Sequence, residues 1–290
     1  MTATLTQLLN TTPGIHAPGA FDAFSALLVE QAGFEAVYLS GASIAYSLLG
    51  RPDIGLVAMT EVAGVITRVR DRVNIPIIVD GDTGFGNALN VQRTVRLFER
   101  AGANAIQLED QTSPKRCGHL ADKSIISTAE MVGKIHAALD ARHSAETLII
   151  ARTDAIGVQG FDAALQRAHA YADAGADILF VEAPQNIEQM QTLCKTFAAN
   201  IALLANMVEG GTTPILERNA LFAMGFRLVI SPGAIMRALT PVVEELLAHL
   251  RDHGSTIAWR DRMLGLMELN ERLELVELLD QGARFEGIKP

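Results

Sequence analysis

The feature that most constrains the fold is one kind of segment that recurs four times along the chain. Its copies read EQAGFEAVYLS (30–40), ERAGANAIQLE (99–109), ADAGADILFVE (172–182) and FAMGFRLVIS (222–231). Each copy has the pattern of a helix end, a glycine, a short link and an apolar run that stops at a polar residue. The four glycines suit the left-handed position that closes a helix: Gly33, Gly102, Gly175 and Gly225. The repeat therefore predicts helix-to-strand joints.

Further apolar runs complete a set of strands. IPIIVD (75–80), LIIAR (148–152) and IALLAN (201–206) are short and lack clean alternation, which is typical of parallel strands covered on both faces. With GIHAP (14–18) as a weaker first strand, the pattern predicts strands near 15–18, 36–39, 76–79, 105–108, 148–151, 178–181, 201–205 and 228–231. Helical patterns such as NVQRTVRLFERA separate them. Eight alternating units favour an α/β fold of the closed (β/α)8 barrel type, with an open doubly wound sheet as the alternative.

The C-terminal part of the chain departs from this repeat. Residues 233–252 and roughly 259–281 read as two helices with no strand between them. No linker rich in Pro, Gly or Ser precedes them, so we expect residues 1–290 to form a single barrel domain with a helical extension at 233–290. The second helix is apolar over much of its surface and needs a partner, either the barrel or another subunit.

Composition excludes several classes of protein. The chain is 49% hydrophobic and 20% charged, which indicates a globular protein, and its net charge of −9 argues against a nucleic-acid partner. No apolar run is long enough to span a bilayer, and MTATLTQLLN lacks the basic and apolar regions of a signal peptide. We expect a protein with no membrane partner, and its two cysteines favour the reducing cytoplasm over a disulfide scaffold.

The predicted strands end on polar residues. In a barrel of this class chemistry takes place at the C-terminal ends of the strands. Charges this close to a core are costly unless they are paired or bound to a metal. The residues at these ends predict a site: Ser40, Asp80 with Asp82, Glu109 with Asp110, Arg152, Glu182, Asn206 and Ser231.

Three of these acids predict a metal site. Asp80, Asp82 and Glu109 would lie on neighbouring strands, where their charges repel one another unless a cation is present. Mg²⁺ typically takes one or two carboxylates, several waters and oxygens of the substrate. The alternative is that the acids cap helices or pair with Arg93 and Arg96. The glycine-rich TGFGN (83–87) lacks the dinucleotide spacing and the P-loop lysine, so we expect a tight turn there.

Arg152 and Cys117 are the other candidates. Arg152 suits a bidentate grip on a substrate carboxylate, or else forms a structural ion pair with Glu182 or Asp154. In PKRCGH (114–119) cations flank Cys117, and cations favour the reactive thiolate. The alternatives are a loop cysteine without function and a zinc site, for which Cys-Gly-His offers only two ligands. Cys194, in QMQTLCKTF, fits ordinary helix packing.

The chain resembles the isocitrate lyase/phosphoenolpyruvate mutase superfamily. The resemblance runs through YLSGASIAYSLLGRPDIGL, VDGDTGFGN, LEDQTSPKRCGH, IIARTDA, FVEAP and LANMVEGGTTP, and covers nearly the whole chain. It implies a Mg²⁺-dependent (β/α)8 barrel, with Mn²⁺ as an alternative ion, that passes through a pyruvate enolate or a related α-oxo-acid intermediate. It also implies a homotetramer whose C-terminal helices pack on, or swap with, neighbouring subunits.

The resemblance also implies roles for single residues. Asp82 would hold Mg²⁺, with Asp80 and Glu109 acting through its waters. Cys117 would be the general acid, and Arg116 and His119 would stabilise its thiolate. Ser40, Gly41 and Ala42 would bind the α-carboxylate of the substrate. Asp53 would lie near the oxo group, and Arg237 would bind a distal carboxylate. The residues expected around the substrate are Ser40, Gly41, Ala42, Asp53, Gly118, Arg152, Glu182, Asn206 and Arg237.

The same resemblance narrows the substrate. K-R-C-G-H is typical of the branch that splits a carbon–carbon bond, where the departing carbanion has to be protonated. Leu266 stands about where methylisocitrate lyases carry an arginine for a third carboxylate, and a buried unpaired carboxylate costs ~3–5 kcal/mol. EGG (209–211) also resembles the alkylmalate-cleaving branch. We therefore expect a small dicarboxylate, an alkylated malate of the 2,3-dimethylmalate type, to be cleaved to pyruvate and a short carboxylate.

Three alternatives stay open. They are 2-methylisocitrate cleavage to pyruvate and succinate, hydrolysis or decarboxylation of oxaloacetate, and a catalytically silent barrel that acts as an assembly or binding subunit. The silent barrel is the weakest of the three, because the acids, the arginine and the thiol of the motifs are all present together.

Overall fold

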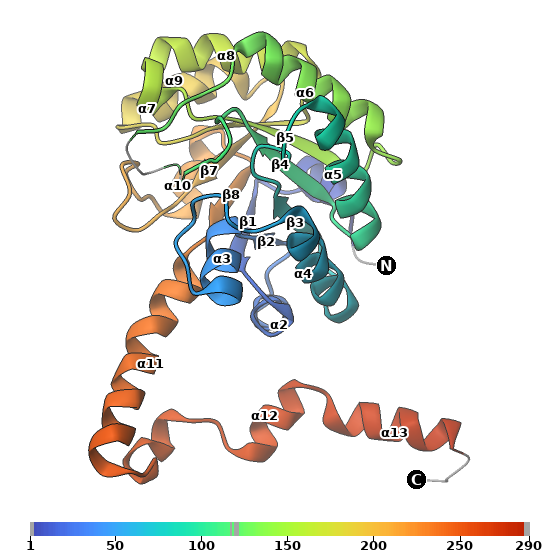
Figure 1. Cartoon of the computed structure of the whole chain (residues 1–290), viewed down its shortest axis with the longest axis vertical. Coiled ribbons are helices and arrows are strands. Elements are labelled where there is room, and N and C mark those ends of the chain that lie inside the picture. The colour runs from blue at the N-terminus through green and yellow to red at the C-terminus, as the bar shows by residue number, and fades with distance from the viewer. Residues whose placement is uncertain (1–2, 117, 119–121, 287–290) are drawn as a thin grey trace. The chain divides into compact units, whose positions relative to one another are not determined.

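The computed structural model describes residues 3–116, 118 and 122–286. Its first unit, Met1–Met236, is a closed barrel of parallel strands that pair in chain order (Figure 1). In this described part the strands are β1 (Ile15–Ala20), β2 (Val37–Leu39), β3 (Ile77–Asp80), β4 (Ala105–Glu109), β5 (Leu148–Thr153), β6 (Ile178–Val181), β7 (Ala202–Asn206) and β8 (Leu228–Ser231). Each predicted strand range overlaps one of these. The pairing of Ile15 with Leu228 closes the barrel and excludes the open sheet.

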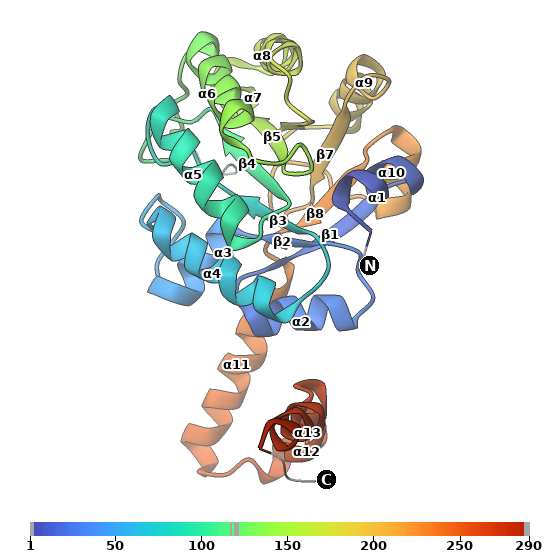
Figure 2. The ribbon, with the colours of Figure 1, turned by 90° about the vertical axis from the view of Figure 1, so that its right-hand side faces the viewer.

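Helices form a ring around the strands (Figure 2). Those that begin in the first unit are α1 (Leu5–Thr11), α2 (Ala23–Gln31), α3 (Gly41–Leu49), α4 (Met59–Arg72), α5 (Ala88–Ala101), α6 (Thr128–Ala141), α7 (Ile156–Gln159), α8 (Phe161–Asp173), α9 (Ile187–Phe197), α10 (Arg218–Met224) and α11 (Ala234–His253). The order of strand and helix is the one that the repeated sequence pattern predicts.

Helix α5 shows how local sequence sets these elements. Asn87 caps its first turn by accepting hydrogen bonds from the backbone N–H groups of Leu89 and Asn90. Its buried residues Val91, Val95 and Phe98 recur at the spacing of one helical face, and that face packs on the barrel. Gly102 ends the helix with a φ of 111°, which is the left-handed conformation predicted at this joint.

Two apolar layers fill the barrel unit. Residues that face outward from the strands pack under the helices, and residues that face inward form a second cluster inside the barrel. Leu5, Leu8 and Leu9 of α1 belong to the inner cluster and lie with Ile15 and Leu148 at the amino-terminal ends of the strands. Helix α1 therefore plugs that end of the barrel, and the opposite end is left for the site.

Strand alternation decides which polar residues reach the open end. Because successive side chains point to opposite faces, a residue two positions after an inward residue also points inward. Tyr38, Ile78, Ile150, Phe180 and Leu204 all lie in the inner cluster. Two positions after each of them come Ser40, Asp80, Arg152, Glu182 and Asn206. These polar residues form the last inward layer, at the mouth of the barrel.

The second unit is Arg237–Pro290. It contains most of α11, a 3₁₀ turn η1 (Ile257–Arg262), α12 (Leu266–Arg272) and α13 (Leu275–Phe285). The first tail helix agrees with its predicted range, but a continuous second helix over 259–281 is wrong. Gly265 precedes α12, and Glu274 adopts a left-handed φ of 60° between α12 and α13, so the apolar pattern is divided.

Within the described residues, no helix is both long enough and apolar enough to cross a membrane. The cytoplasmic location and the division into one barrel domain with an extension from residue 233 stay predictions.

Candidate active site

The start of α3 lies against the acids at the barrel mouth. Ser40 caps this helix, and its hydroxyl oxygen accepts a hydrogen bond from the backbone N–H of Ser43. A Cβ atom on Gly41 would lie only 2.9 Å from Asp80 Oδ2, so the backbone approaches that carboxylate closely. Ala42 follows in the same turn. A helix amino terminus favours anions, which supports the predicted carboxylate-binding role of this segment.

Asp80 is held by neutral donors. Its Oδ1 accepts hydrogen bonds from the backbone N–H of Asp82 at 3.1 Å and from Gln107 Nε2 at 3.1 Å. Gln107 in turn accepts a hydrogen bond at 3.0 Å from the hydroxyl of Tyr38 inside the barrel. These hydrogen bonds fix the carboxylate of Asp80, which makes no direct ion pair with a described residue, and its second oxygen, Oδ2, faces α3.

A tight turn presents Asp82, as the glycine-rich sequence predicts. Asp82 itself has a left-handed φ of 48°, and Gly84 and Phe85 also have positive φ. The buried Lys134 of α6 donates a hydrogen bond to the carbonyl of Thr83 at 3.0 Å and so braces the turn from behind. The unusual backbone at Asp82 is therefore supported by a specific contact.

Lys115 supplies a cation among the acids. Its ammonium lies 2.7 Å from Asp53 Oδ1 and 2.8 Å from Asp82 Oδ1, and its side chain is only 5% exposed. Burial opposes the charged form of this lysine. The carboxylates of Asp82, Asp80, Glu109 and Asp53 nevertheless raise its pKa well above the usual value. The acids thus have a counter-charge from the chain itself.

Burial also raises the pKa values of two acids at the site, Asp82 and Glu109. It raises the pKa of Asp82 to about 6, against the opposing effect of Lys115. It raises the pKa of Glu109 well above the usual value, and Arg152 only partly offsets this. Glu109 is 1% exposed, and its Oε1 has no hydrogen-bond partner among the residues that the structure describes.

The donor set fits a weakly pre-formed magnesium site. Across residues 3–116, 118 and 122–286, no group of three or more His, Cys, Asp or Glu side chains is placed so that it could hold a metal ion. One carboxylate in direct contact, with the others reached through water, is nonetheless ordinary for Mg²⁺. Asp82 in its tight turn fits that arrangement, as does Glu109, whose Oε1 has no hydrogen-bond partner among the described residues. The metal roles of Asp80, Asp82 and Glu109 stay predictions.

Arg152 makes the ion pairs that were the alternative to substrate binding. Its Nε and Nη2 donate to the two oxygens of Asp154 at 2.8 and 3.0 Å, and Glu109 and Glu182 lie at 3.3 and 3.4 Å. The guanidinium also stacks over the ring of Phe180 at 5.1 Å. Among the described residues, the partners of this guanidinium are therefore reached through Nε and Nη2.

Glu182, Asn206 and Gly118 lie next to this arginine. Asn206 Nδ2 donates to Glu182 Oε2 at 3.0 Å, and Asn206 Oδ1 is buried without a hydrogen-bond partner among the described residues. A Cβ on Gly118 would lie 2.3 Å from Arg152 Nη2 and 2.8 Å from Glu182 Cγ. The structure therefore brings these predicted residues together, and only glycine fits at position 118.

Asp110 is not part of the acid cluster, contrary to its expected pairing with Glu109. Because side chains alternate along a strand, Asp110 points to the opposite side from Glu109, toward α8. There its carboxylate accepts hydrogen bonds from Tyr171 at 2.7 Å, Arg167 at 3.1 Å and Thr153 at 2.8 Å. Its function is to join α8 to the strand ends.

For four other predicted site residues, no contact between described residues places the side chain at the barrel mouth. The side chain of Arg116 is 50% exposed and lies 3.6 Å from Asp122, although its backbone is held by Gln111. Arg237 lies on α11 in the second unit. Cys117 and His119 lie outside the described residues. The roles of all four stay predictions.

Three polar residues of the site were not predicted as such. Lys115 was interpreted only as one of the cations beside the cysteine, Lys123 was not singled out, and Asp154 was only one alternative partner for Arg152. Asp154 had a readable signal, since it lies two positions after Arg152 in the inward phase. No sequence pattern indicated that the two lysines are buried, because their partners are distant in the chain.

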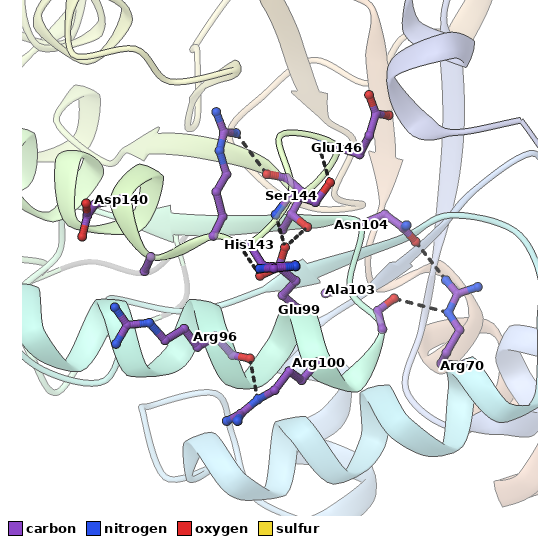
Figure 3. Close-up of a pocket in the computed structure, with 14 residues that line it drawn as sticks. Arg70, Arg96, Glu99, Arg100, Ala103, Asn104, Asp140, His143, Ser144 and Glu146 are labelled. Carbon is purple, nitrogen blue, oxygen red and sulfur yellow. Dashed lines mark hydrogen bonds between the residues drawn. The ribbon is translucent and has the colours of Figure 1, made fainter.

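A separate cavity of about 1040 Å³ lies at the opposite end of the barrel unit, between the last turns of α4, α5 and α6 (Figure 3). Its polar groups mainly bind one another: Glu99 accepts from the backbone of His143 and Ser144, and Arg70 donates to Asn104. The side chains of Arg96 and Arg100 do not converge on one point in Figure 3. We therefore assign the chemistry to the barrel mouth.

Comparison with known proteins agrees with the geometry. The family model described as "Phosphoenolpyruvate phosphomutase" matches residues 5–251. The chain is 43% identical to a 2,3-dimethylmalate lyase of Eubacterium barkeri over 95% of both chains. It is 46% identical to a 2-methylisocitrate lyase of Aeropyrum pernix over 87% of this chain and 80% of that one.

Solved structures of the same superfamily also superpose on this chain. An oxaloacetate acetylhydrolase in complex with the inhibitor 3,3-difluorooxalacetate superposes with a TM-score of 0.92 at 32% identity, covering 99% of this chain and 97% of that one. A phosphonopyruvate hydrolase in complex with oxalate and Mg²⁺ superposes with a TM-score of 0.86 at 30% identity, covering 96% of each chain.

The position of Lys115 gives a prediction for the metal-free protein. Lys115→Met leaves Asp53 and Asp82 without their cation, and breaking a buried ion pair typically costs ~3–5 kcal/mol. We expect the free energy of unfolding in EDTA to fall, and Mg²⁺ to restore more stability in the variant than in the wild type. Urea unfolding with and without Mg²⁺ measures both, with the exposed Lys195→Met as control. An unchanged stability of Lys115→Met in EDTA would contradict the assigned role.

Proposed function

Because this chain belongs to the isocitrate lyase/phosphoenolpyruvate mutase superfamily and is a carbon–carbon lyase of it, we propose that it cleaves an alkyl-substituted malate of the 2,3-dimethylmalate type. The products would be pyruvate and a short carboxylate. The observation that carries the proposal is the convergence of Asp82, Glu109 and Arg152 at one barrel mouth, beside the amino terminus of α3.

The reaction breaks one bond between two carbons. The hydroxyl of the tertiary carbon gives its proton to a basic group and becomes the oxo group of pyruvate, while the bond to the neighbouring carbon breaks. The electron pair goes to the departing carboxylate, so the enolate belongs to that fragment and not to pyruvate, which corrects the pyruvate enolate expected from the resemblance. Protonation of its α-carbon then gives propionate from 2,3-dimethylmalate. This last step needs an acid, which is the role proposed for Cys117.

The residues at the mouth divide between the two halves of such a substrate. The amino terminus of α3, with Ser40, Gly41 and Ala42, would bind the carboxylate of the pyruvate half, and Arg152 would reach the same region. Asp53, paired with Lys115, would lie near the oxo group. Gly118, Glu182 and Asn206 would line the second half, and Arg237 would meet a distal carboxylate.

Magnesium would be held by Asp82 directly and by Asp80 and Glu109 through water. When bound, the ion supplies Lewis-acid polarisation of the oxygen that becomes the oxo group. The unpartnered Oε1 of Glu109 supports this placement, as does the presence of Mg²⁺ in the similar phosphonopyruvate hydrolase. Lys115 would then exchange its contact with Asp82 for other neighbours.

The proposed choice of substrate rests on the residues that would bind the half of the substrate away from the pyruvate carboxylate. Leu266 would offer no charge where a methylisocitrate lyase carries an arginine, and the match to the dimethylmalate lyase extends over 95% of both chains. The match to 2-methylisocitrate lyase keeps that substrate as the second candidate. Oxaloacetate hydrolysis is the third, favoured by the similarity to the oxaloacetate acetylhydrolase structure.

Steady-state kinetics on a panel of substrates tests this order. We expect pyruvate to be released from 2,3-dimethylmalate in the presence of Mg²⁺, with a higher kcat/KM than from 2-methylisocitrate, and no release in EDTA. A higher kcat/KM for 2-methylisocitrate would reverse the order of the two substrates. Acetate and oxalate formed from oxaloacetate would favour the third candidate. No product from any of the three would contradict the lyase proposal.

The cysteine gives a second kinetic prediction. Cys117→Ser should keep the fold and Mg²⁺ affinity but lose most turnover, because general acid catalysis typically contributes about 10²–10⁴-fold. Cys194→Ser is the matched control, since Cys194 is buried on α9 and burial raises the pKa of its thiol to about 11. We expect the control to turn over like the wild type. If Cys117→Ser does so as well, another residue is the acid.

We further propose a homotetramer in which the C-terminal helices pack on neighbouring subunits. The described residues of α11 and α13 include none that is buried, yet Val276 and Leu279 are apolar and 56% and 63% exposed. Sedimentation equilibrium should give four subunits. Replacing both residues by Glu should produce a smaller species, whereas Glu277→Gln on the same helix should not. A monomeric wild type would contradict the proposal.

A further inference from the structure

Lys123 connects two parts of the site. Its side chain is 4% exposed, and its ammonium lies 2.8 Å from Asp154 Oδ1. The same ammonium donates a hydrogen bond to the backbone carbonyl of Gly118. A buried lysine with two such partners is uncommon for a loop residue, since burying an ammonium is costly unless its hydrogen bonds are made.

Asp154 shares its carboxylate between Lys123 and Arg152. Both of its oxygens accept from the guanidinium of Arg152, and its backbone N–H donates to Asp110 Oδ1 at 2.9 Å. Burial opposes ionisation of this acid, but Arg152 and Lys123 outweigh it and hold the pKa of Asp154 at about 2. The carboxylate is therefore charged and held by two cations, and the backbone of the same residue is held by Asp110.

Gly118 completes the connection. It fits against Arg152 Nη2 and Glu182 only because it has no side chain. The contacts therefore form a closed circuit: Asp154 binds Arg152, Gly118 lies close against Arg152, and Lys123 joins Gly118 back to Asp154.

The ends of this loop are already fixed without Lys123. The backbone N–H of Thr112 donates to the carbonyl of Ser124 at 2.9 Å, and Gln111 forms an isolated antiparallel bridge with Ile125. The contact of Lys123 with Asp154 is therefore an additional link from the loop to the inside of the barrel. Its removal should leave both the loop ends and the barrel in place.

We propose that Lys123 and Asp154 are positioning residues that hold Gly118 on Arg152, so that the loop after β4 and the substrate-binding guanidinium act as one unit. The proposal rests on the proposed lyase function for its kinetic consequence. Neither residue needs to touch substrate. Both act through Arg152 and the loop, and a misplacement of about 1 Å at such a site can cost roughly 10²-fold in rate.

The main variant is Lys123→Met, which keeps the length of the side chain and removes its charge. Asp154 keeps its bonds to Arg152 in this variant, so we expect a smaller fall in the free energy of unfolding than in Lys115→Met. Turnover of the substrate identified by the panel should fall by roughly ten- to a hundred-fold in kcat, with a smaller change in KM. Lys123→Arg should recover part of the rate because it restores the charge, and the exposed Lys195→Met should behave like the wild type.

A second measurement needs no substrate. Amide hydrogen exchange of the segment 111–125 should be faster in Lys123→Met than in the wild type and the control. Asp154→Asn should also accelerate it, and the double variant should be no faster than Asp154→Asn alone, because both changes break the same link. This coupling is measurable even if the protein cleaves none of the tested acids, so its failure is separate from failure of the lyase proposal.

The outcomes are distinct. Faster exchange in both single variants without an additive effect supports the link between Lys123 and Asp154, and a loss of kcat that Lys123→Arg partly recovers supports its role in turnover. Exchange in Lys123→Met equal to that of the wild type overturns the inference. A Lys123→Met enzyme with wild-type kcat overturns the positioning role.

Discussion

The site depends on a balance of charge inside the barrel mouth. Several carboxylates converge there because strand alternation and one tight turn bring them there, and like charges at this distance cannot all remain ionised without cations. Lys115 pairs with Asp53 and Asp82, and Arg152 pairs with Asp154 while lying close to Glu109 and Glu182. The geometry of the acids therefore cannot be separated from these two cations. A metal ion would add positive charge to a site whose carboxylates are already partly neutralised by Lys115 and Arg152.

Most of the fold and much of the mouth follow from local sequence. The glycines at four of the helix-to-strand joints and the short apolar runs predict the strands, because both reflect constraints that act within a few residues. Alternation then predicts that Asp80 and Arg152 point inward. The same rule places Asp110 in the outward phase, although its adjacency to Glu109 had indicated an acid of the cluster. Periodicity was the better guide there, because side chains in a strand alternate.

The features that could not be predicted depend on contacts between distant segments. Lys115 is 62 residues from Asp53 in the chain, and nothing near Lys115 in the sequence distinguishes a buried lysine from a solvated one. In the tail the apolar pattern continues across Gly265 and Glu274, yet the backbone breaks at both. Patterns of hydrophobicity indicate which faces of a helix or strand are buried. They do not indicate which distant residue forms an ion pair with a given charged side chain.

The plug formed by α1 has a consequence for the passage of molecules. Leu5, Leu8 and Leu9 close the amino-terminal end of a barrel whose interior is already filled by side chains, so among the described residues the site opens at the carboxyl ends of the strands. A lyase turns one substrate into two products, and both would have to leave by the route through which the substrate arrived. The fragment nearer to solvent must clear that route before the deeper one can follow, so architecture alone would impose an order of release on the two products.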